Sequence, residues 1–217
     1  MKLIQSWDDG VTNDIKLADM LRKYKATATL NLNIALNKKE RSAGWKYKET
    51  DVGRLGTDEM PELYRGFEIA SHSLKHPHLP QCTPEALKEE LEASRARLQE
   101  IFHQPILGFA YPFGDYSEPV KAALRAAGYT HARTVKKSDG TFPPKDPMEF
   151  HPDCRFSDPE FWTLYERNKA MGSPVFFCWG HSYELINDLM WNDFEEKVAR
   201  LSSDPANTWV NISSLFG

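Results

Sequence analysis

The chain has 217 residues, and its 27 basic and 31 acidic side chains give a formal net charge of −4 at pH 7. This length suits one domain, and we expect residues 1–217 to form a single unit. A content of 41% hydrophobic residues is that of a folded protein with a core. A mildly acidic chain without a basic stripe is not expected to bind nucleic acid.

The termini and cysteines bear on the compartment. No apolar stretch approaches the roughly 18 residues of a transmembrane helix, so no membrane association is expected. The first seven residues, MKLIQSW, run directly into Asp8, which leaves no room for a secretory leader. We therefore expect a cytoplasmic protein, although a mature chain that follows a removed leader fits the same sequence. Cys82, Cys154 and Cys178 are odd in number and widely spaced, which favours free thiols over disulfides.

The first half of the chain alternates strand and helix patterns. Alternating residues in 26–34 indicate a strand, whereas Thr83, followed by Pro84 and Glu85, marks the start of the clearest helix. The polar segment 36–56 predicts an inserted loop. We predict strands at residues 2–7, 26–34 and 67–72, and helices at residues 12–24, 57–64 and 83–102.

The second half continues this alternation. We predict strands at residues 106–111, 129–135, 175–179 and 208–212, and helices at residues 117–127, 158–171 and 191–202. Residues 139–147, rich in Pro and Gly, predict a loop. Strands separated by helices indicate an α/β fold with a parallel sheet, either a barrel or an open doubly wound sheet. In both architectures, chemistry gathers at the carboxyl ends of the strands.

Two adjacent acids end the first predicted strand. Successive side chains of a strand face opposite sides, so Asp8 and Asp9 cannot point the same way. One can hold a metal while the other faces a reacting group. Such a pair can instead cap the next helix, but Thr12 and Asn13 are available for that task.

Two histidines four residues apart follow the strand at 67–72. On one turn of helix or in a tight loop, His72 and His76 can share a metal ion. Together with one carboxylate they leave open coordination positions, as catalytic rather than structural sites do. His78, His103 and His131 are interpreted as structural residues, and His151 fits either role.

The motifs in this order resemble those of the polysaccharide deacetylase family (carbohydrate esterase family 4). Ser6-Trp7-Asp8-Asp9-Gly10 is similar to the first motif and Ser71-His72-Ser73-Leu74-Lys75-His76 to the second. Tyr111-Pro112-Phe113-Gly114 is similar to the third, and Trp179-Gly180-His181 to the fifth. The resemblance implies a distorted (β/α)7 barrel, a TIM-barrel-like deacetylase fold, in one catalytic domain.

The resemblance also implies residue roles. Asp8 would be the catalytic base and His181 the general acid, while Asp9, His72 and His76 would hold one divalent metal. Zn²⁺ is the ion most expected, and Co²⁺, Ni²⁺ and Mn²⁺ also suit these ligands. The resemblance also implies that the backbone N–H of Phe113 donates to the oxyanion. The substrate-binding candidates are Tyr111, Trp179 and Arg133.

The chain departs from the family pattern at two motifs. Ala110 stands where the third motif usually carries the arginine that pairs with the catalytic acid, and Arg133 or Arg155 could replace it. The acidic fourth motif is not recognisable, and Asp153 is a candidate for it. Aromatic side chains near the strand ends either stack on substrate or pack in the core: Trp7, Tyr111, Phe113, Tyr116, Trp179 and Tyr183. The segment 36–56, with Trp45 and Tyr47, is either a lid or a surface loop.

These observations predict a hydrolase that removes an N-acyl group, most simply acetyl, from an amino sugar or small carbohydrate. The partner expected is therefore a small-molecule or oligosaccharide substrate. Two alternatives remain open: an amidase acting on a non-sugar amide, and a catalytically silent sugar-binding barrel that keeps its metal. The absent motif arginine favours the silent barrel, whereas Asp8 and His181 argue against it because neither is needed merely to hold a metal.

Overall fold

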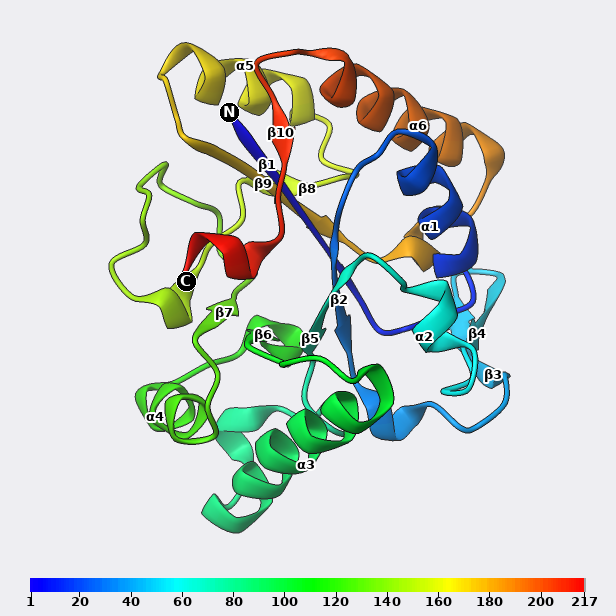
Figure 1. Cartoon of the computed structure of the whole chain (residues 1–217), viewed down its shortest axis with the longest axis vertical. Coiled ribbons are helices and arrows are strands. Elements are labelled where there is room, and N and C mark those ends of the chain that lie inside the picture. Colours follow the sequence, from blue (N-terminus) through cyan, green and yellow to red (C-terminus); the bar gives the residue numbers. More distant parts are fainter. Residues whose placement is uncertain (217) are drawn as a thin grey trace.

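The structure is a computed structural model that describes residues 1–216, and a parallel sheet runs through its centre (Figure 1). The strands follow the order β7-β6-β5-β2-β1-β9-β8, with β10 beside the start of β1, and every pairing in this sheet is parallel. Their bounds are β1 (Lys2–Asp8), β2 (Thr29–Leu32), β5 (Glu68–Ser71), β6 (Gly108–Ala110), β7 (His131–Arg133), β8 (Cys154–Arg155), β9 (Val175–Gly180) and β10 (Thr208–Trp209).

Residues 150–155 close the sheet into a barrel. The Phe150 N–H donates to the Ala132 carbonyl at 2.9 Å, and the Asp153 N–H donates to the Phe177 carbonyl at 2.7 Å. This segment therefore fills the gap between β7 and β9, and it contains β8. The predicted parallel barrel is confirmed, in a distorted form because the link to β7 is a single bridge between Arg133 and Phe150.

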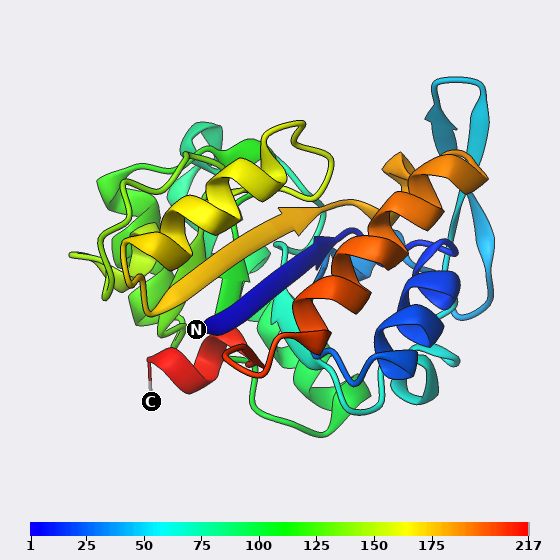
Figure 2. The same cartoon turned by 90° about the horizontal axis from the view of Figure 1, so that it is seen from above.

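Helices cover the outside of the sheet, with α1, α5 and α6 on one side and α3 and α4 on the other (Figures 1 and 2). Their bounds are α1 (Asp14–Lys23), α2 (Met60–Leu63), α3 (Pro84–Phe102), α4 (Glu118–Ala126), α5 (Phe161–Ala170) and α6 (Asp188–Ser203). Short 3-10 turns are η1 (Ile34–Leu36), η2 (Leu79–Gln81), η3 (Pro112–Gly114), η4 (Pro147–Glu149), η5 (Ser182–Glu184) and η6 (Ile212–Leu215). The Thr83 hydroxyl caps α3 as expected. No helix in residues 1–216 combines the length and apolar character that crossing a membrane requires.

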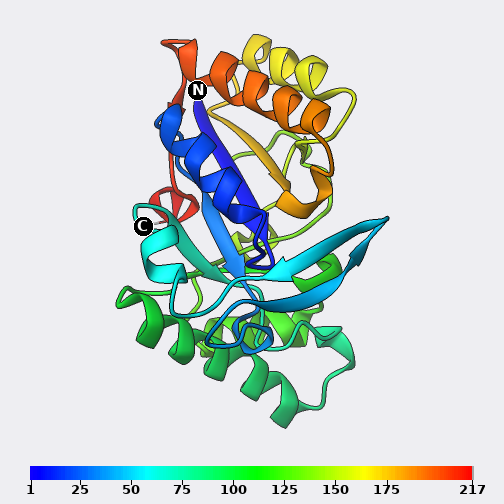
Figure 3. The ribbon, with the colours of Figure 1, turned by 90° about the vertical axis from the view of Figure 1, so that its right-hand side faces the viewer.

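The segment predicted as a loop is a β-hairpin, so that prediction is wrong. Strands β3 (Ser42–Tyr47) and β4 (Thr50–Arg54) pair antiparallel and project from the body of the molecule (Figures 2 and 3). The rings of Trp45 and Tyr47 each lie 5.1 Å from the ring of Tyr183. A hairpin with so little buried surface has no clear apolar alternation, which is why its sequence resembles a loop.

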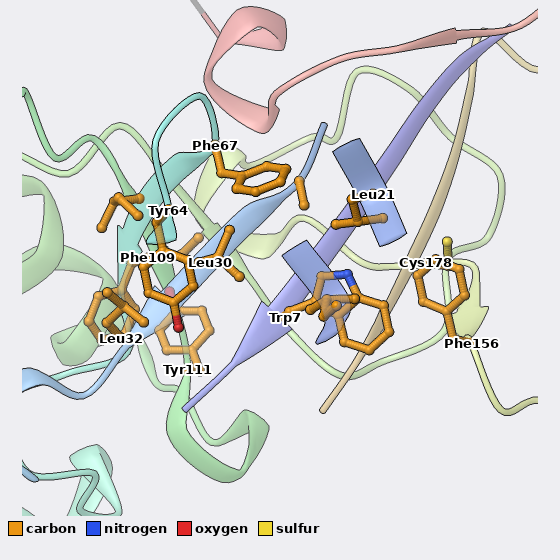
Figure 4. Close-up of a cluster of buried hydrophobic side chains, with 14 of the residues drawn as sticks. Trp7, Leu21, Leu30, Leu32, Tyr64, Phe67, Phe109, Tyr111, Phe156 and Cys178 are labelled. Carbon is orange, nitrogen blue, oxygen red and sulfur yellow. The ribbon is translucent and has the colours of Figure 1, made fainter. Parts of the chain in front are cut away.

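Trp7 fixes the direction of the acid that follows it. Its side chain is 1% exposed and stacks on Phe156 at 4.8 Å (Figure 4). It also meets the edge of Phe194 in α6 at 5.2 Å. The indole N–H donates to the Gln5 side chain at 3.0 Å. Since Trp7 packs outward against the helices, the alternation of β1 turns Asp8 into the barrel. Trp7 is therefore a core residue.

The buried side chain of Asp14 joins three segments of the chain. Its buried carboxylate accepts hydrogen bonds from the Ser182 hydroxyl at 2.5 Å, the Tyr64 hydroxyl at 2.6 Å and the Val11 N–H at 3.2 Å. At the start of helix α1, Asp14 binds the Val11 N–H, whereas Asn13, one of the two predicted caps, makes no side-chain cap hydrogen bond. Burial raises the pKa of Asp14 to about 6 despite these hydrogen bonds.

Replacing this carboxylate with an amide should change how stability depends on pH. The raised pKa means that folding favours neutral Asp14, so its contribution to stability is full below pH 4 and is lost as the pH rises through 6. From pH 4 to pH 7, the unfolding free energy of the native protein should fall by up to about 3 kcal/mol relative to that of Asp14→Asn. Denaturant unfolding at both pH values measures this, with exposed Asp19→Asn as the control. Parallel pH dependences of native protein and Asp14→Asn would contradict it.

Candidate metal centre and active site

The carboxyl ends of the barrel strands surround one cavity of about 490 Å³. Asp8 ends β1, His72 follows β5, and His181 follows β9, so residues far apart in sequence meet at one edge of the sheet. The lining combines acids, histidines and aromatic rings: Asp8, Asp9, His72, His76, Tyr111, Phe113, Gly114, Val135, Arg155, Trp179, His181 and Tyr183. The expectation that these side chains gather at the strand ends holds.

Asp9, His72 and His76 form a cluster in which one ligand atom from each lies within 4.8 Å of the others. The Nδ1 atom of His72 lies 2.8 Å from the Ala110 carbonyl oxygen, so Nδ1 donates and Nε2 is left as the free lone-pair atom. The Nε2 atoms of His72 and His76 face each other at 3.1 Å. Burial and the neighbouring His72 lower the pKa of His76 to about 4, which keeps its ring neutral and able to bind a metal.

The backbone around this cluster adopts conformations that side chains other than glycine seldom favour. Asp9 has φ 87° and His76 has φ 61°, and Phe113 beside them has φ 58°. Each such residue costs of order 1 kcal/mol and persists because its surroundings hold it there. For Asp9, the Asn33 amide donates to the carboxylate at 2.6 Å, and Arg54 donates to the Asp9 carbonyl at 3.2 Å.

Asp8 is a buried carboxylate with a dedicated cation. A guanidinium N–H of Arg133, itself 1% exposed, donates to Oδ2 at 2.5 Å, and the Asn31 amide donates to Oδ1 at 2.7 Å. Burial raises the pKa of Asp8, but the positive charge of Arg133, aided by His72 and His181, outweighs it and holds the pKa well below the usual range. Asp8 is therefore ionised at neutral pH and able to accept a proton from a bound reactant.

Three carboxylates surround the His181 ring. Its Nε2 atom is 3.7 Å from Asp8 Oδ2 and 3.9 Å from Asp9 Oδ2, while Nδ1 is 3.2 Å from Glu184 Oε1. Burial alone would lower the pKa of His181, but Glu184, Asp8 and Asp9 raise it above the ordinary value. The ring therefore tends to hold a proton close to the cavity, which suits a general acid.

The other predicted substrate-binding residues lie in the cavity wall and differ in exposure and in the contacts that hold them. Phe113 is 54% exposed and stacks on His78 at 3.9 Å. Trp179 is mostly buried, with the Arg133 guanidinium 4.6 Å from its ring. The Tyr111 hydroxyl donates to the Met148 carbonyl at 3.0 Å, so only its ring faces the cavity.

The structure separates the two arginines that could replace the motif residue missing at Ala110. Arg133 contacts Asp8, whereas Arg155 contacts Glu184 at 3.1 Å. Asp153, the candidate for the fourth motif, accepts a hydrogen bond from the Phe177 N–H at 2.7 Å, away from His181.

Sequence reasoning missed Glu184, Arg54, Asn31 and Asn33 as residues of the site. A usable signal existed for Glu184, because an acid three residues after His181 can return to the ring across one 3-10 turn. The asparagines are spaced two apart on and after β2, which also indicates one inward face. The other histidines lie outside the metal cluster: His78 pairs with Asp115, His103 ends α3, His131 is in β7, and His151 lies 2.6 Å from Thr134.

The chain is similar to known proteins of one family. The family model described as polysaccharide deacetylase matches residues 2–132. The Bacillus subtilis (strain 168) protein YxkH, named as a polysaccharide deacetylase, is 29% identical over 133 residues, which are 60% of this chain and 43% of YxkH. The solved structure of BC0361, a polysaccharide deacetylase from Bacillus cereus, shares 25% identity at a TM-score of 0.55, over 68% of this chain and 45% of that one.

A third likeness covers the whole chain. BA3943 from Bacillus anthracis, described as a CE4 family pseudoenzyme, aligns with 100% of this chain and 65% of its own at a TM-score of 0.57. With 14% identity, it bears on the fold alone. The chain spans less than half the length of YxkH and of BC0361. Because the family match covers more than half of the chain and contains the acid pair and both clustered histidines, this protein belongs to the polysaccharide deacetylase family.

Proposed function

We propose that this protein is a metal-dependent hydrolase that removes an N-acetyl group from an amino sugar or a short carbohydrate. The observation that carries the proposal is the division of labour between two neighbouring acids. Asp9 lies with His72 and His76, while Asp8, whose Oδ2 atom is 3.9 Å from His72 Nε2, is hydrogen-bonded to Arg133 instead. A protein that only bound a metal or a sugar would have no use for a second, separately ionised carboxylate beside His181.

The donor set fits a divalent ion. Two ligands each about 2.0–2.1 Å from a tetrahedral zinc ion lie about 3.3 Å apart, close to the 3.1 Å between the two histidine Nε2 atoms. One carboxylate and two neutral imidazoles suit Zn²⁺ first, and Co²⁺, Ni²⁺ or Mn²⁺ as well. When bound, such an ion would supply Lewis-acid polarisation of the acyl carbonyl and lower the pKa of a water molecule.

The chain's own residues then account for the proton transfers. Asp8 accepts a proton from the water that attacks the acyl carbon, and the backbone N–H of Phe113 donates to the oxygen that becomes negative. His181 donates its proton to the amide nitrogen as the carbon–nitrogen bond breaks, which releases acetate and an amine. The 3.7 Å between His181 Nε2 and Asp8 Oδ2 supports these roles, because both groups can then reach one reacting centre.

The alternative of a catalytically silent barrel loses its main support. That reading rested on Ala110 in place of an arginine, but Arg133 reaches Asp8 from the neighbouring strand β7. A cavity of about 490 Å³ lies in the range of small-molecule sites. A comparison of N-acetylglucosamine with a non-sugar acetanilide decides whether the amide belongs to a sugar.

Acetate release tests the proposal. Metal-stripped protein with added Zn²⁺ or Co²⁺ should release acetate from N-acetylglucosamine or its short oligomers. Asp8→Asn and His181→Ala should each lower kcat by about 10²–10⁴-fold, because each removes one proton transfer. Asp115→Asn, which alters a carboxylate that pairs with His78 and does not line the cavity, is the control and should stay near the native rate. Release from a chromogenic acetanilide alone would favour a non-sugar amidase, and release from no amide would contradict the proposal.

Metal binding should depend on His76 and not on His78. Calorimetric titration with Zn²⁺ should give one ion per chain, and His76→Ala should weaken the affinity by more than about 100-fold because it removes a ligand. His78→Ala is the matched control two residues away, since His78 stacks on Phe113 outside the cluster. Equal losses in both variants, or no ion bound by the native protein, would rule out this assignment.

The pH dependence of catalysis should identify the cation that serves Asp8. In Arg133→Met, burial is no longer outweighed, so the pKa of Asp8 should rise and the acidic limb of kcat/KM should move to higher pH. Arg155→Met should leave that limb in place, because Arg155 contacts Glu184 instead. A shift in the Arg155 variant and none in the Arg133 variant would reverse the assignment.

A further inference from the structure

Arg155 is a cation in the cavity wall that neither the metal cluster nor the proton transfers require. Among the lining residues that the structure describes, it carries the one guanidinium or ammonium group. Its side chain is 44% exposed, whereas that of Arg133 is 1% exposed and committed to Asp8. Arg155 belongs to β8, the short strand that completes the barrel beside β9.

Two contacts hold the Arg155 guanidinium in place. It lies 4.6 Å from the ring centre of Trp179, and one N–H group lies 3.1 Å from Glu184 Oε1. Within residues 1–216, the structure gives this guanidinium no further ion pair, so its other N–H groups are available to a ligand. The same Glu184 oxygen is 3.2 Å from His181 Nδ1. Arg155 and the proposed general acid His181 therefore contact one carboxylate oxygen.

The surrounding charges do not oppose an anion at this position. The three carboxylates Asp8, Asp9 and Glu184 are matched in number by three guanidiniums. Arg133 bonds Asp8, Arg155 contacts Glu184, and Arg54 donates to the Asp9 carbonyl and to Asn33, whose amide bonds the Asp9 carboxylate. Repulsion from the two acids of the first motif is therefore offset before any substrate binds.

We infer that the substrate carries an anionic substituent, a carboxylate or a phosphate, on the acetylated sugar, and that Arg155 binds it. This inference rests on the proposed function and adds the class of sugar. A guanidinium offers parallel N–H donors that match carboxylate and phosphate oxygens, and Trp179 lies close enough to this guanidinium for a cation–π contact. Arg155 is thus a specificity-determining residue rather than part of the proton transfers.

A competing role for Arg155 would act only through Glu184. In that case Arg155 would orient the carboxylate that contacts His181, and its removal would slow every substrate equally. Substrate recognition predicts a different pattern, in which the affinity for anionic sugars falls and neutral sugars are unaffected. Loss of substrate recognition would therefore raise KM for anionic sugars alone, whereas loss of a role through Glu184 would lower kcat for every substrate.

The test compares sugars that share one ring and differ in charge. N-acetylglucosamine is neutral, N-acetylmuramic acid adds a carboxylate, and N-acetylglucosamine 6-phosphate adds a phosphate. For the native protein, kcat/KM should be higher for at least one of the two acids, and the preferred one identifies the anion. Arg155→Gln should raise KM for that acid by about 10- to 100-fold, the range of a charge-assisted hydrogen bond. It should leave kcat and the neutral sugar within about threefold, and Arg155→Lys should restore part of the preference.

Arg97→Gln is the matched control, since it removes the same charge from an exposed position on α3. Calorimetric affinities for muramic acid, glucosamine 6-phosphate and glucosamine provide a readout that needs no turnover. Failure of all acetate release with retained, Arg155-dependent binding of an acid would contradict the proposed function and support the inference. Normal release with no preference for either acid, or an equal loss for neutral and acidic sugars in Arg155→Gln, would overturn the inference alone.

Discussion

The buried ion pair between Asp8 and Arg133 is the interaction on which the rest of the site depends. A carboxylate that is 2% exposed would take up a proton unless a cation compensated for the lost water. Arg133 provides that cation from β7, on the far side of the sheet order from β1, so the pair can form only when the barrel is assembled. Folding and the ionisation of Asp8 are therefore linked. The packing of Trp7 against α6 supports the pair because it turns Asp8 inward.

Neighbouring polar and charged side chains also hold the other two carboxylates of the site. Asp9 is held by Asn33, which Arg54 of the hairpin in turn contacts at 2.9 Å, and Glu184 lies between His181 and Arg155. The positive φ angles of Asp9, His76 and Phe113 lie beside these contacts. Strained backbone conformations persist where surrounding contacts over-determine them, and such positions concentrate at functional sites. The rigidity of the cluster thus arises from its neighbours rather than from local sequence preference.

Much of this arrangement is legible in the sequence because it follows from periodicity and motif order. The long helix after Thr83 and the strands predicted at residues 2–7 and 67–72 have clear patterns and are correct in type. The hairpin was missed because most of its residues are exposed, which removes the apolar alternation that marks a strand. The choice between Arg133 and Arg155 could not be made from sequence, since it depends on which strands are neighbours. Glu184 has a usable signal in its spacing of three residues from His181, but the sequence alone does not establish the 3-10 turn that brings the two side chains together.

The central claim is that Asp9, His72 and His76 hold one catalytic divalent ion while Asp8 stays free of it. Anomalous diffraction from crystals soaked with Co²⁺ and acetate tests this most directly. We expect one strong peak bonded to the Asp9 carboxylate and to Nε2 of both histidines, with acetate between the ion and His181. A peak bonded to Asp8, a peak elsewhere in the chain, or no ion at the cluster would contradict the account.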